Sequence, residues 1–551
     1  MESGTPKSSL PMAESNKKPS LFFFLLFLCL SPYSSLSQSN YIIFFSDKNN
    51  SSFSLSNPGS FLSSKAIDRR LKQNISMSLQ DLPVNQNYLD SLVDKGAQVL
   101  TSSKWLNAAL VFADPSQMAA ITQLSFVKKT EVALRKTKTY SANEINLFHS
   151  SSANLNYGSS YNQVSMIGID QMHEQGFHGE GMLIAVIDGG FSNLNTMPLF
   201  DSLFMNNRIL STYDFVDQEN DVYDDHIHGT QVLSLLASYS EGILIGGAWR
   251  SNYILLRSEN ANSEFLGEEM YWAAAAEYAD SAGVDIINSS IGYSTFDNSS
   301  TNHSYSGLDG NSTLITQAAD IAASKGILVI NSMGNEGNTS WKYMLAPADG
   351  DLVLAVGSVT PGRTYTFNSS LGPTYDGRIK PDVSAQGSGV VVASSSGGTQ
   401  VGTGTSFAAP LITSLAAGLW QAFPSLTNVE LMYYIRRSAS QYHNPDEKLG
   451  YGIPYFSIAR NMIAAHKETL YLFPNPIEEQ ALILNLPKVD IGKEITIRFT
   501  DITGRFITEE IVPQGEFRTE LKTDMSFWAP GFYLLTLTTP ANKYVMKILK
   551  K

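Results

Sequence analysis

The stretch EEMYWAAAAEYADSAGVDIINSSIG at residues 268–292 joins an Ala-rich segment ending at Gly283 to an apolar, β-branched segment. The first half is typical of a helix stopped by glycine, and the second of a strand buried on both faces. The same pairing recurs in STLITQAADIAASKGILVINSMGN at 312–335, and MLIAVID at 182–188 is another buried strand. Alternating helices and buried strands predict an α/β fold, with a doubly wound parallel sheet covered on both faces.

Polar residues stand where three of these strands end. Asp188 closes the first strand, Ser290 lies near the end of the second, and Asn335 follows the third. Functional residues of a parallel sheet gather at the carboxyl ends of its strands. The sequence therefore predicts a site at this edge of the sheet.

Length and charge limit the classes of function. At about 100–200 residues per domain, 551 residues indicate three or four units. The 38 basic and 51 acidic residues give a net charge of −13, which argues against nucleic acid or an anionic membrane as the main partner. The longest apolar run, at 21–30, is shorter than the roughly 20 residues that span a bilayer, so no transmembrane segment is expected.

The first 37 residues have the pattern of a secretory signal peptide. Lys17 and Lys18 precede the apolar run LFFFLLFLCL at 21–30, and small polar residues follow it. A short buried helix is the alternative. Cys29, the only cysteine, lies in this run, so a processed chain would have no disulfide, thiol catalyst or cysteine-bound metal.

Composition divides the rest of the chain into four zones. A mixed zone at 38–140 is followed by a linker rich in Ser, Asn and Tyr at 141–163. The α/β zone covers 164–465. Residues 470–551 alternate apolar and polar residues between Gly, Pro and Asp, which predicts a small all-β sandwich.

Three segments of the α/β zone carry candidate catalytic residues. Asp188 lies in IAVIDGG, His228 opens the helix-like segment HGTQVLSLLA, and Ser406 lies in GTGTSFAAP at the start of an Ala-rich helix. A serine hydroxyl becomes a nucleophile when an imidazole accepts its proton and a carboxylate orients that imidazole. Each residue alone is more often a cap or a turn residue. Their occurrence together, in one zone, favours nucleophilic catalysis.

These segments resemble the signature blocks of the subtilisin-like serine proteases, the subtilases. GTSFAAP at 404–410 matches the serine block except for Phe407, and HGTQVLS matches the histidine block with Gln231 in place of a second histidine. In the aspartate block, Gly189 replaces the usual Ser or Thr. The resemblance implies a subtilisin-like fold and the triad order Asp, His, Ser.

Two further blocks extend the resemblance. NSSIGY at 288–293 is similar to the strand that pairs with substrate, which implies that Ser290, Ile291 and Gly292 bind peptide main chain. SMGNEG at 332–337 is similar to the block whose Asn donates to the oxyanion.

That second block implies particular roles for its residues. Asn335 would form the oxyanion hole together with the backbone N–H of Ser406. The floor of the substrate pocket would include Ser332, Met333 and Gly334, with Met333 narrowing it.

The flanking zones resemble export and processing segments. Residues 38–140 are similar to the prodomain of Bacteroidetes subtilases, which implies a small α/β domain that assists folding, blocks the cleft and is cut off between 135 and 163. An unrelated domain that stays attached is the alternative. Residues 470–551 resemble the sorting domain of the type IX secretion system, on YLFPNP, DITGR and the Lys-rich end; a carbohydrate-binding sandwich is the alternative.

We therefore expect a secreted or cell-surface serine endopeptidase, exported across the outer membrane, whose partners are peptide substrates, its own prodomain and the secretion machinery. The competing hypothesis is an inactive subtilase fold that serves as an adhesin or binding module. No cofactor is expected for the reaction. Calcium is possible in DFVDQENDVYDD at 214–225, but no ligand can be assigned, and a solvated acidic loop is the alternative.

Overall fold

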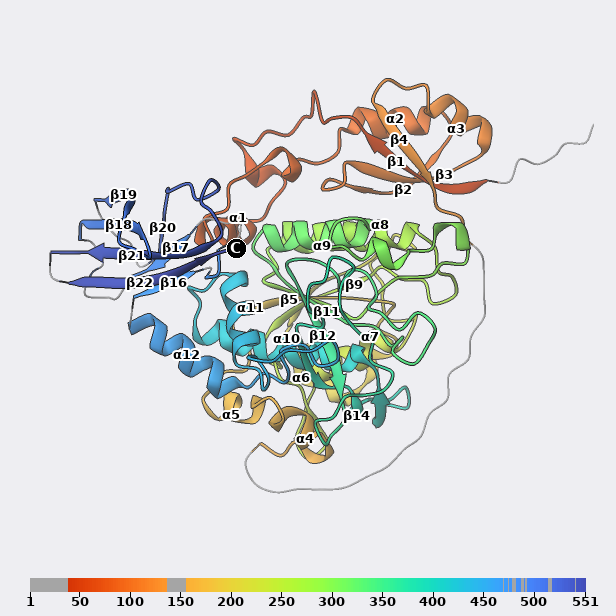
Figure 1. Ribbon diagram of the computed structural model, residues 1–551. Coiled ribbons are helices and arrows are strands. Elements are labelled where there is room, and N and C mark those ends of the chain that lie inside the picture. Colours follow the sequence, from red (N-terminus) through yellow and green to blue (C-terminus); the bar gives the residue numbers. More distant parts are fainter. Residues whose placement is uncertain are drawn as a thin grey trace, which may run out of the picture. The chain divides into compact units, whose positions relative to one another are not determined.

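A computed structural model describes residues 38–135 and 155–468, and most of the C-terminal region (Figure 1). The expected signal peptide at 1–37, with Cys29, and most of the expected processing region lie outside the described residues. Among the residues described, no helix is long and apolar enough to cross a membrane. The gaps in the C-terminal region are 469, 474, 478–481, 487–489, 491–492, 514–517 and 541.

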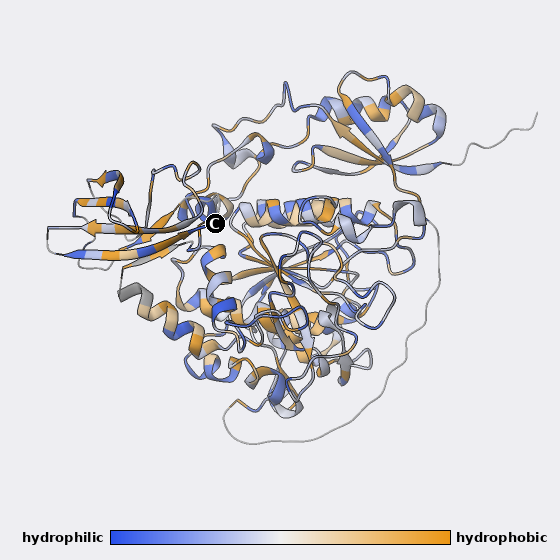
Figure 2. Cartoon of the chain, in the orientation of Figure 1, coloured by the Kyte–Doolittle hydropathy of each residue, from blue (hydrophilic) through white to orange (hydrophobic). Residues whose placement is uncertain are grey.

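A seven-stranded parallel sheet forms the centre of the α/β region, in the order β13-β12-β11-β10-β5-β9-β6. Its strands are mostly hydrophobic, as expected for strands covered on both faces (Figure 2). The predicted doubly wound α/β fold is confirmed. The strands are β5 (Leu183–Asp188), β6 (Ile209–Asp214), β9 (Asn252–Arg257), β10 (Ile286–Ser289), β11 (Leu328–Ser332), β12 (Val353–Val359) and β13 (Val383–Gln386).

Helices cover both faces of this sheet (Figure 1). Neighbouring residues of β5 show the two faces: Val186 packs in one core with α7 and α10, whereas Ile187 packs in another with α8 and α9. The first core is bounded by α5 (Ile169–Glu174), α7 (His228–Ala237), α10 (Thr405–Ala422), α11 (Asn428–Arg437) and α12 (Phe456–Glu468), and the second by α8 (Gly267–Ala282) and α9 (Leu314–Ser324).

Shorter elements complete this region. Residues 155–163, within the expected linker, are folded: Tyr157 and Gln163 are buried, and the side chain of Gln163 bonds to the backbone of Val391. The folded α/β region therefore starts before residue 164. The other short elements are α4 (Tyr161–Ser165), α6 (Asp201–Met205), β7 (Tyr239–Ser240), β8 (Leu244–Ile245), β14 (Ser388–Ala393) and β15 (Thr399–Thr403).

The N-terminal region contains a four-stranded antiparallel sheet in the order β2-β3-β1-β4. Alternate residues of β1 face opposite sides: Ile43 packs with residues of α2 and α3, whereas Ile42 packs in the core that contains α8. The elements are β1 (Ser39–Phe45), α1 (Ser64–Lys72), α2 (Gln86–Asp94), β2 (Gln98–Ser103), β3 (Ala108–Ala113), α3 (Pro115–Ile121) and β4 (Val127–Val132).

A buried charge cluster joins this region to α8. Asp280 lies 2.5 Å from Arg69, 2.9 Å from Arg70 and 3.2 Å from Lys104, and Arg70 also lies 2.8 Å from Asp81. All five side chains are at most 8% exposed. The cluster therefore depends on both regions for its charge balance.

The C-terminal region is an all-β sandwich, as predicted. Residues of its two sheets, including Leu484 and Phe499, share one core. One sheet contains β16 (Tyr471–Phe473), β17 (Ile483–Asn485) and β20 (Arg518–Glu520), and the other contains β18 (Ile495–Asp501), β19 (Phe506–Val512), β21 (Gly531–Thr538) and β22 (Lys543–Lys550).

Candidate active site

Asp188 and His228 form a hydrogen-bonded pair at the carboxyl end of β5. Nδ1 of His228, the first residue of α7, lies 2.8 Å from Oδ1 of the fully buried Asp188. Burial alone would lower the pKa of His228, but the Asp188 carboxylate raises it above its ordinary value. A carboxylate at Nδ1 favours the tautomer that keeps a proton there, which leaves Nε2 able to accept one.

Two glycines allow this pairing. Gly190, in the turn after β5, has φ +140°, and a Cβ on it would lie 2.6 Å from the backbone N of His226. A Cβ on Gly229 would lie 2.4 Å from the carbonyl oxygen of Gly190, which accepts the Gly229 N–H at 3.0 Å. Because only glycine permits such close approach, the turn meets the start of α7 and places His228 beside Asp188.

Ser406 is the second residue of α10, at the same edge of the sheet. Oγ of Ser290, just past β10, donates to the carbonyl oxygen of Ser406 at 3.0 Å. The ring of the next residue, Phe407, is centred 6.0 Å from the ring of His228. The first turn of α10 is therefore held between the end of β10 and the start of α7.

Asn335 is oriented by the residue that precedes Ser406. Its Oδ1 accepts hydrogen bonds from the backbone N of Thr405 at 2.9 Å and from Oγ1 of Thr405 at 3.2 Å. The Nδ2 donor is thereby left for another acceptor. A Cβ on Gly404 would lie 3.5 Å from this Nδ2 and 3.8 Å from the backbone N of Ser406, so the two donors border a common space.

The three residues after β10 differ in their surroundings. Ile291 is buried in the core, and its carbonyl oxygen accepts a 3.0 Å hydrogen bond from Nδ2 of Asn331. Ser290 contacts Ser406 through its side chain, and Gly292 lines a cavity. Gly292 is therefore the residue of this triplet that borders open space.

The opposite side of the site follows β11. Gly334 has φ +100° and donates its N–H to Oγ1 of Thr405 at 3.1 Å. Met333, however, is fully buried in the core with α8 and α9 residues. The expectation that Met333 narrows the pocket is therefore not borne out, because its side chain has no exposed surface and does not line the cavity beside the site.

Comparison with known families identifies the region that carries these residues. The model of the subtilase family matches residues 179–452, which include each candidate residue described above. Residues 179–452 belong to the subtilase family.

Curated subtilisins are similar to parts of this chain that range from about half to about two thirds of its length. Subtilisin NAT of Bacillus subtilis subsp. natto is 27% identical over 358 residues, which cover 64% of this chain and 81% of that protein. The subtilisin of Bacillus pumilus is 28% identical over 280 residues, which cover 50% and 90%. The thermostable alkaline protease of Halalkalibacterium halodurans is 27% identical over 286 residues, covering 51% and 68%.

The two flanking regions also match family models. The peptidase S8 propeptide domain of Bacteroidota matches residues 40–147, and the secretion system C-terminal sorting domain matches 471–551. The chain is thus a subtilisin-like serine endopeptidase with a propeptide. Its sorting domain directs export through type IX secretion to the cell surface or the extracellular space.

A cavity of about 340 Å³ adjoins the subtilase site. It lies between the segments 259–264 and 292–297, with Glu336 and Leu345 also in its lining. Four carboxylates contribute to the lining, those of Glu259, Glu264, Asp297 and Glu336. The walls of this cavity are therefore acidic.

Glu259 is a residue near the catalytic pair that the sequence patterns did not single out. A Cβ on Gly189 would lie 3.3 Å from its Oε2, so Glu259 stands beside the residue that follows Asp188. Burial and the charge of Asp188 raise the pKa of Glu259 to about 7. The sequence did contain a signal for the position of Glu259. Arg257 ends β9, the strand next to β5, in register with Asp188, and Glu259 follows Arg257 by two residues.

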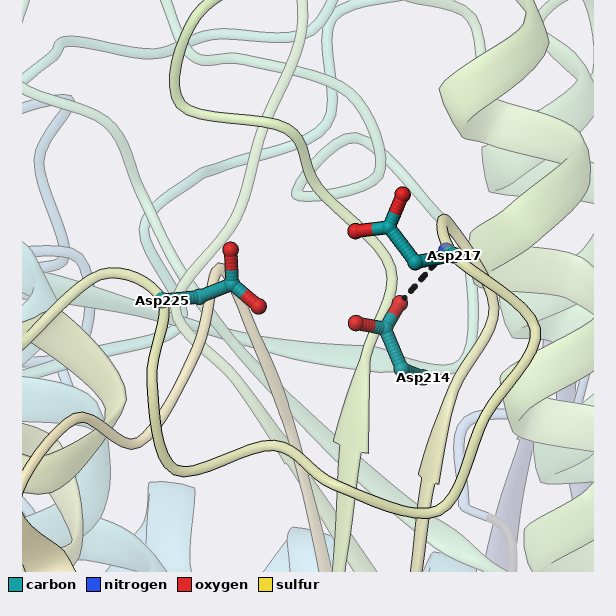
Figure 3. Close-up of side chains that lie close together, drawn as sticks. All are labelled: Asp214, Asp217 and Asp225. Carbon is teal, nitrogen blue, oxygen red and sulfur yellow. Dashed lines mark hydrogen bonds between the residues drawn. The ribbon is translucent and has the colours of Figure 1, made fainter.

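Among the residues that the structure describes, the acidic loop carries a group of three carboxylates that could hold a metal ion. They belong to Asp214, Asp217 and Asp225, and their oxygens lie within 4.8 Å of one another (Figure 3). Nη1 of Arg257 lies 2.5, 2.6 and 2.9 Å from these carboxylates. Burial, together with repulsion from Asp214, raises the pKa of Asp225 to about 6 in spite of Arg257. The loop is thus an ion cluster around a buried guanidinium rather than a fully solvated surface.

Replacing Arg257 with glutamine should destabilise the protein by about 3–5 kcal/mol, because Asp214 would stay buried without a cation. The free energy of unfolding in urea, measured on the precursor inactivated by Ser406→Ala, reports this change. The control is Arg250→Gln, which removes a partly exposed pair with Glu180 and should cost about 1 kcal/mol or less. Equal losses in the two variants would show that Arg257 has no special role.

Proposed function

We propose that Ser406, His228 and Asp188 hydrolyse peptide bonds through an acyl-enzyme. Nε2 of His228 takes the hydroxyl proton while Oγ of Ser406 bonds to the substrate carbonyl carbon. The C–N bond then breaks, and the proton passes from His228 to the leaving amine. A water molecule repeats the sequence on the ester, releasing the acid and free Ser406. Asp188 orients His228 and stabilises its charged form.

The negative charge on the substrate oxygen would be held by two donors. These are Nδ2 of Asn335, oriented by the contacts of its Oδ1 with Thr405, and the backbone N–H of Ser406. The start of α10 adds the favourable end of a helix dipole. Donors fixed before the reaction stabilise the transition state more than the substrate, which is what accelerates the chemical step.

No cofactor is assigned to the reaction, because the proposed steps need only these side chains and water. The acidic loop has a stabilising role in this proposal, with Arg257 as the cation among its carboxylates. Calcium has no assigned site.

The N-terminal region would act as an intramolecular partner until it is cut off. Its sheet shares a core with α8, and its charges balance Asp280. We propose that it assists folding of the subtilase region and limits access to the site before cleavage between 135 and 163. The sorting domain would then be the part recognised by the secretion machinery.

The observation that carries the proposal is the 2.8 Å contact between His228 and Asp188, with the ring of Phe407, the residue after Ser406, centred 6.0 Å from His228, and with Asn335 oriented by Thr405. Incubation of purified mature protein with casein tests it, with cleavage followed by mass spectrometry. We expect internal cleavage of casein. Intact casein at all enzyme concentrations would favour the alternative, an adhesin or binding module with a subtilase fold.

The pH dependence of hydrolysis should report the ionisation of His228. Only neutral His228 accepts the serine proton, and the pKa of this group is raised above its ordinary value of 6.5. Measured on a chromogenic peptide, kcat/KM should therefore rise about tenfold per pH unit at acidic pH and then reach a plateau. The midpoint of this rise should lie above pH 6.5. A midpoint below 6.5 would show that Asp188 does not stabilise the charged imidazole.

A further inference from the structure

The proposed function, on which this inference rests, determines where the substrate side chain immediately before the scissile bond must lie. The attacked carbonyl must lie at Oγ of Ser406, with its oxygen near Nδ2 of Asn335. Asn335 follows β11, and β10, which precedes Gly292, is the neighbouring parallel strand. The side chain before the scissile bond therefore enters the gap between Gly292 and Gly334.

Leu345 occupies this gap from its inner side. A Cβ on Gly292 would lie 2.7 Å from Cβ of Leu345, and a Cβ on Gly334 would lie 2.7 Å from Cγ of Leu345. Real Cβ atoms essentially never come within 3.0 Å of another atom. The Leu345 side chain therefore touches both glycines and spans the distance between the two segments.

The backbone around Leu345 is tied to both sides of the gap. Its N–H donates to the carbonyl oxygen of Met333 at 3.2 Å. The next residue, Ala346, exchanges two backbone hydrogen bonds with Tyr293, at 2.9 and 3.1 Å. Tyr293 follows Gly292 directly, and Met333 precedes Gly334. The backbone that carries Leu345 thus cannot move away from the gap without breaking hydrogen bonds to both segments.

We propose that Leu345 is a specificity-determining residue that makes the enzyme select a small side chain, of Gly, Ala or Ser, immediately before the scissile bond. A large side chain at that position would overlap the four carbons of Leu345. Leu345 also lines the cavity of about 340 Å³ beside residues 292–297. In this proposal that cavity is left for side chains from other substrate positions.

Chromogenic tetrapeptide anilides that differ only in the residue before the anilide test this proposal. With the unmodified mature enzyme, kcat/KM for Ala should exceed that for Phe by at least about tenfold. Leu345→Gly should reverse the preference, with at least about a tenfold gain for Phe. Leu345→Met, which conserves volume, is the matched control and should keep the preference for Ala.

The outcomes separate this inference from the proposed function. If the enzyme cleaves casein but prefers Phe to Ala, or if the ratio is the same in Leu345→Gly, the role of Leu345 is overturned. If Leu345→Gly does not fold, Leu345→Ala serves in its place and should show a smaller shift toward Phe. If casein and every peptide stay intact, the proposed function fails and this inference fails with it.

Discussion

Replacing Ser406 with alanine should lower kcat for peptide hydrolysis by about 10⁶-fold, the cost of the same change in subtilisin. The substitution removes Oγ, the one atom that forms a covalent bond with the substrate in the proposed mechanism. The oxyanion donors and the surface that binds substrate stay unchanged. We also expect the precursor to keep its N-terminal region, because the same hydroxyl would perform the cleavage between 135 and 163. Intact mass spectrometry of the purified precursor measures processing, and casein hydrolysis measures activity.

A serine two turns along the same helix provides the control. Ser414 is fully buried in α10, about 12 Å along the helix axis from Ser406, so Ser414→Ala removes the same hydroxyl group away from the proposed nucleophile. This variant should mature and cleave casein normally. A Ser406→Ala precursor that is processed but inactive would mean that another protease performs the cleavage. Processing together with full activity would contradict the role of Ser406 as nucleophile.

Replacing Asp280 with asparagine should destabilise the precursor by about 3–5 kcal/mol. Arg69 and Lys104 would lose their anionic partner, and Arg70 would keep only Asp81. The loss is large because these cations are buried, so water cannot take the place of the carboxylate. Urea unfolding of the Ser406→Ala precursor, with and without the change, measures it.

Acid should reproduce part of this effect in the unchanged precursor. Burial raises the pKa of Asp280, but Lys104, Arg69 and Arg70 together lower it to about 2, below its ordinary value of 3.8. A carboxylate with a lowered pKa stabilises the fold above its ordinary pKa and loses this contribution as pH falls to the folded value. The stability difference between the two precursors should therefore shrink between about pH 4 and pH 2.

The control for Asp280 is the more exposed contact of Lys65 with Asp285, at 2.6 Å. The Lys65 side chain is 40% exposed, so Lys65→Gln should cost about 1 kcal/mol or less. If Asp280→Asn costs no more than Lys65→Gln, the buried cluster does not hold the N-terminal region in place.

Local patterns account for what could be predicted. Runs such as LIAVID have the composition of buried strands, and glycines such as Gly283 mark the ends of helices. The parallel sheet and the helices that cover it could therefore be predicted from the sequence. The pairing of Asp188 with His228 was also accessible, because one ends a strand and the other begins a helix at the same edge of a parallel sheet.

Contacts between distant segments account for what could not be predicted. Arg69 and Asp280 are 211 positions apart, and no periodicity indicates that they meet. The acidic loop was visible as a charge run, but its cation, Arg257, is 40 positions from Asp217. Leu345 stands in an irregular segment, and only the packing of two glycines against it shows which gap it occupies.

The mass of the mature protein after reaction with a fluorophosphonate tests the role of the candidate site most directly. Such probes bond to a serine only when a base takes its proton and an oxyanion pocket receives the developing charge. We predict a single adduct, on the peptide that contains Ser406, and no adduct after His228→Ala. An adduct on a different residue, or casein hydrolysis by a protein that the probe never modifies, would contradict the assignment.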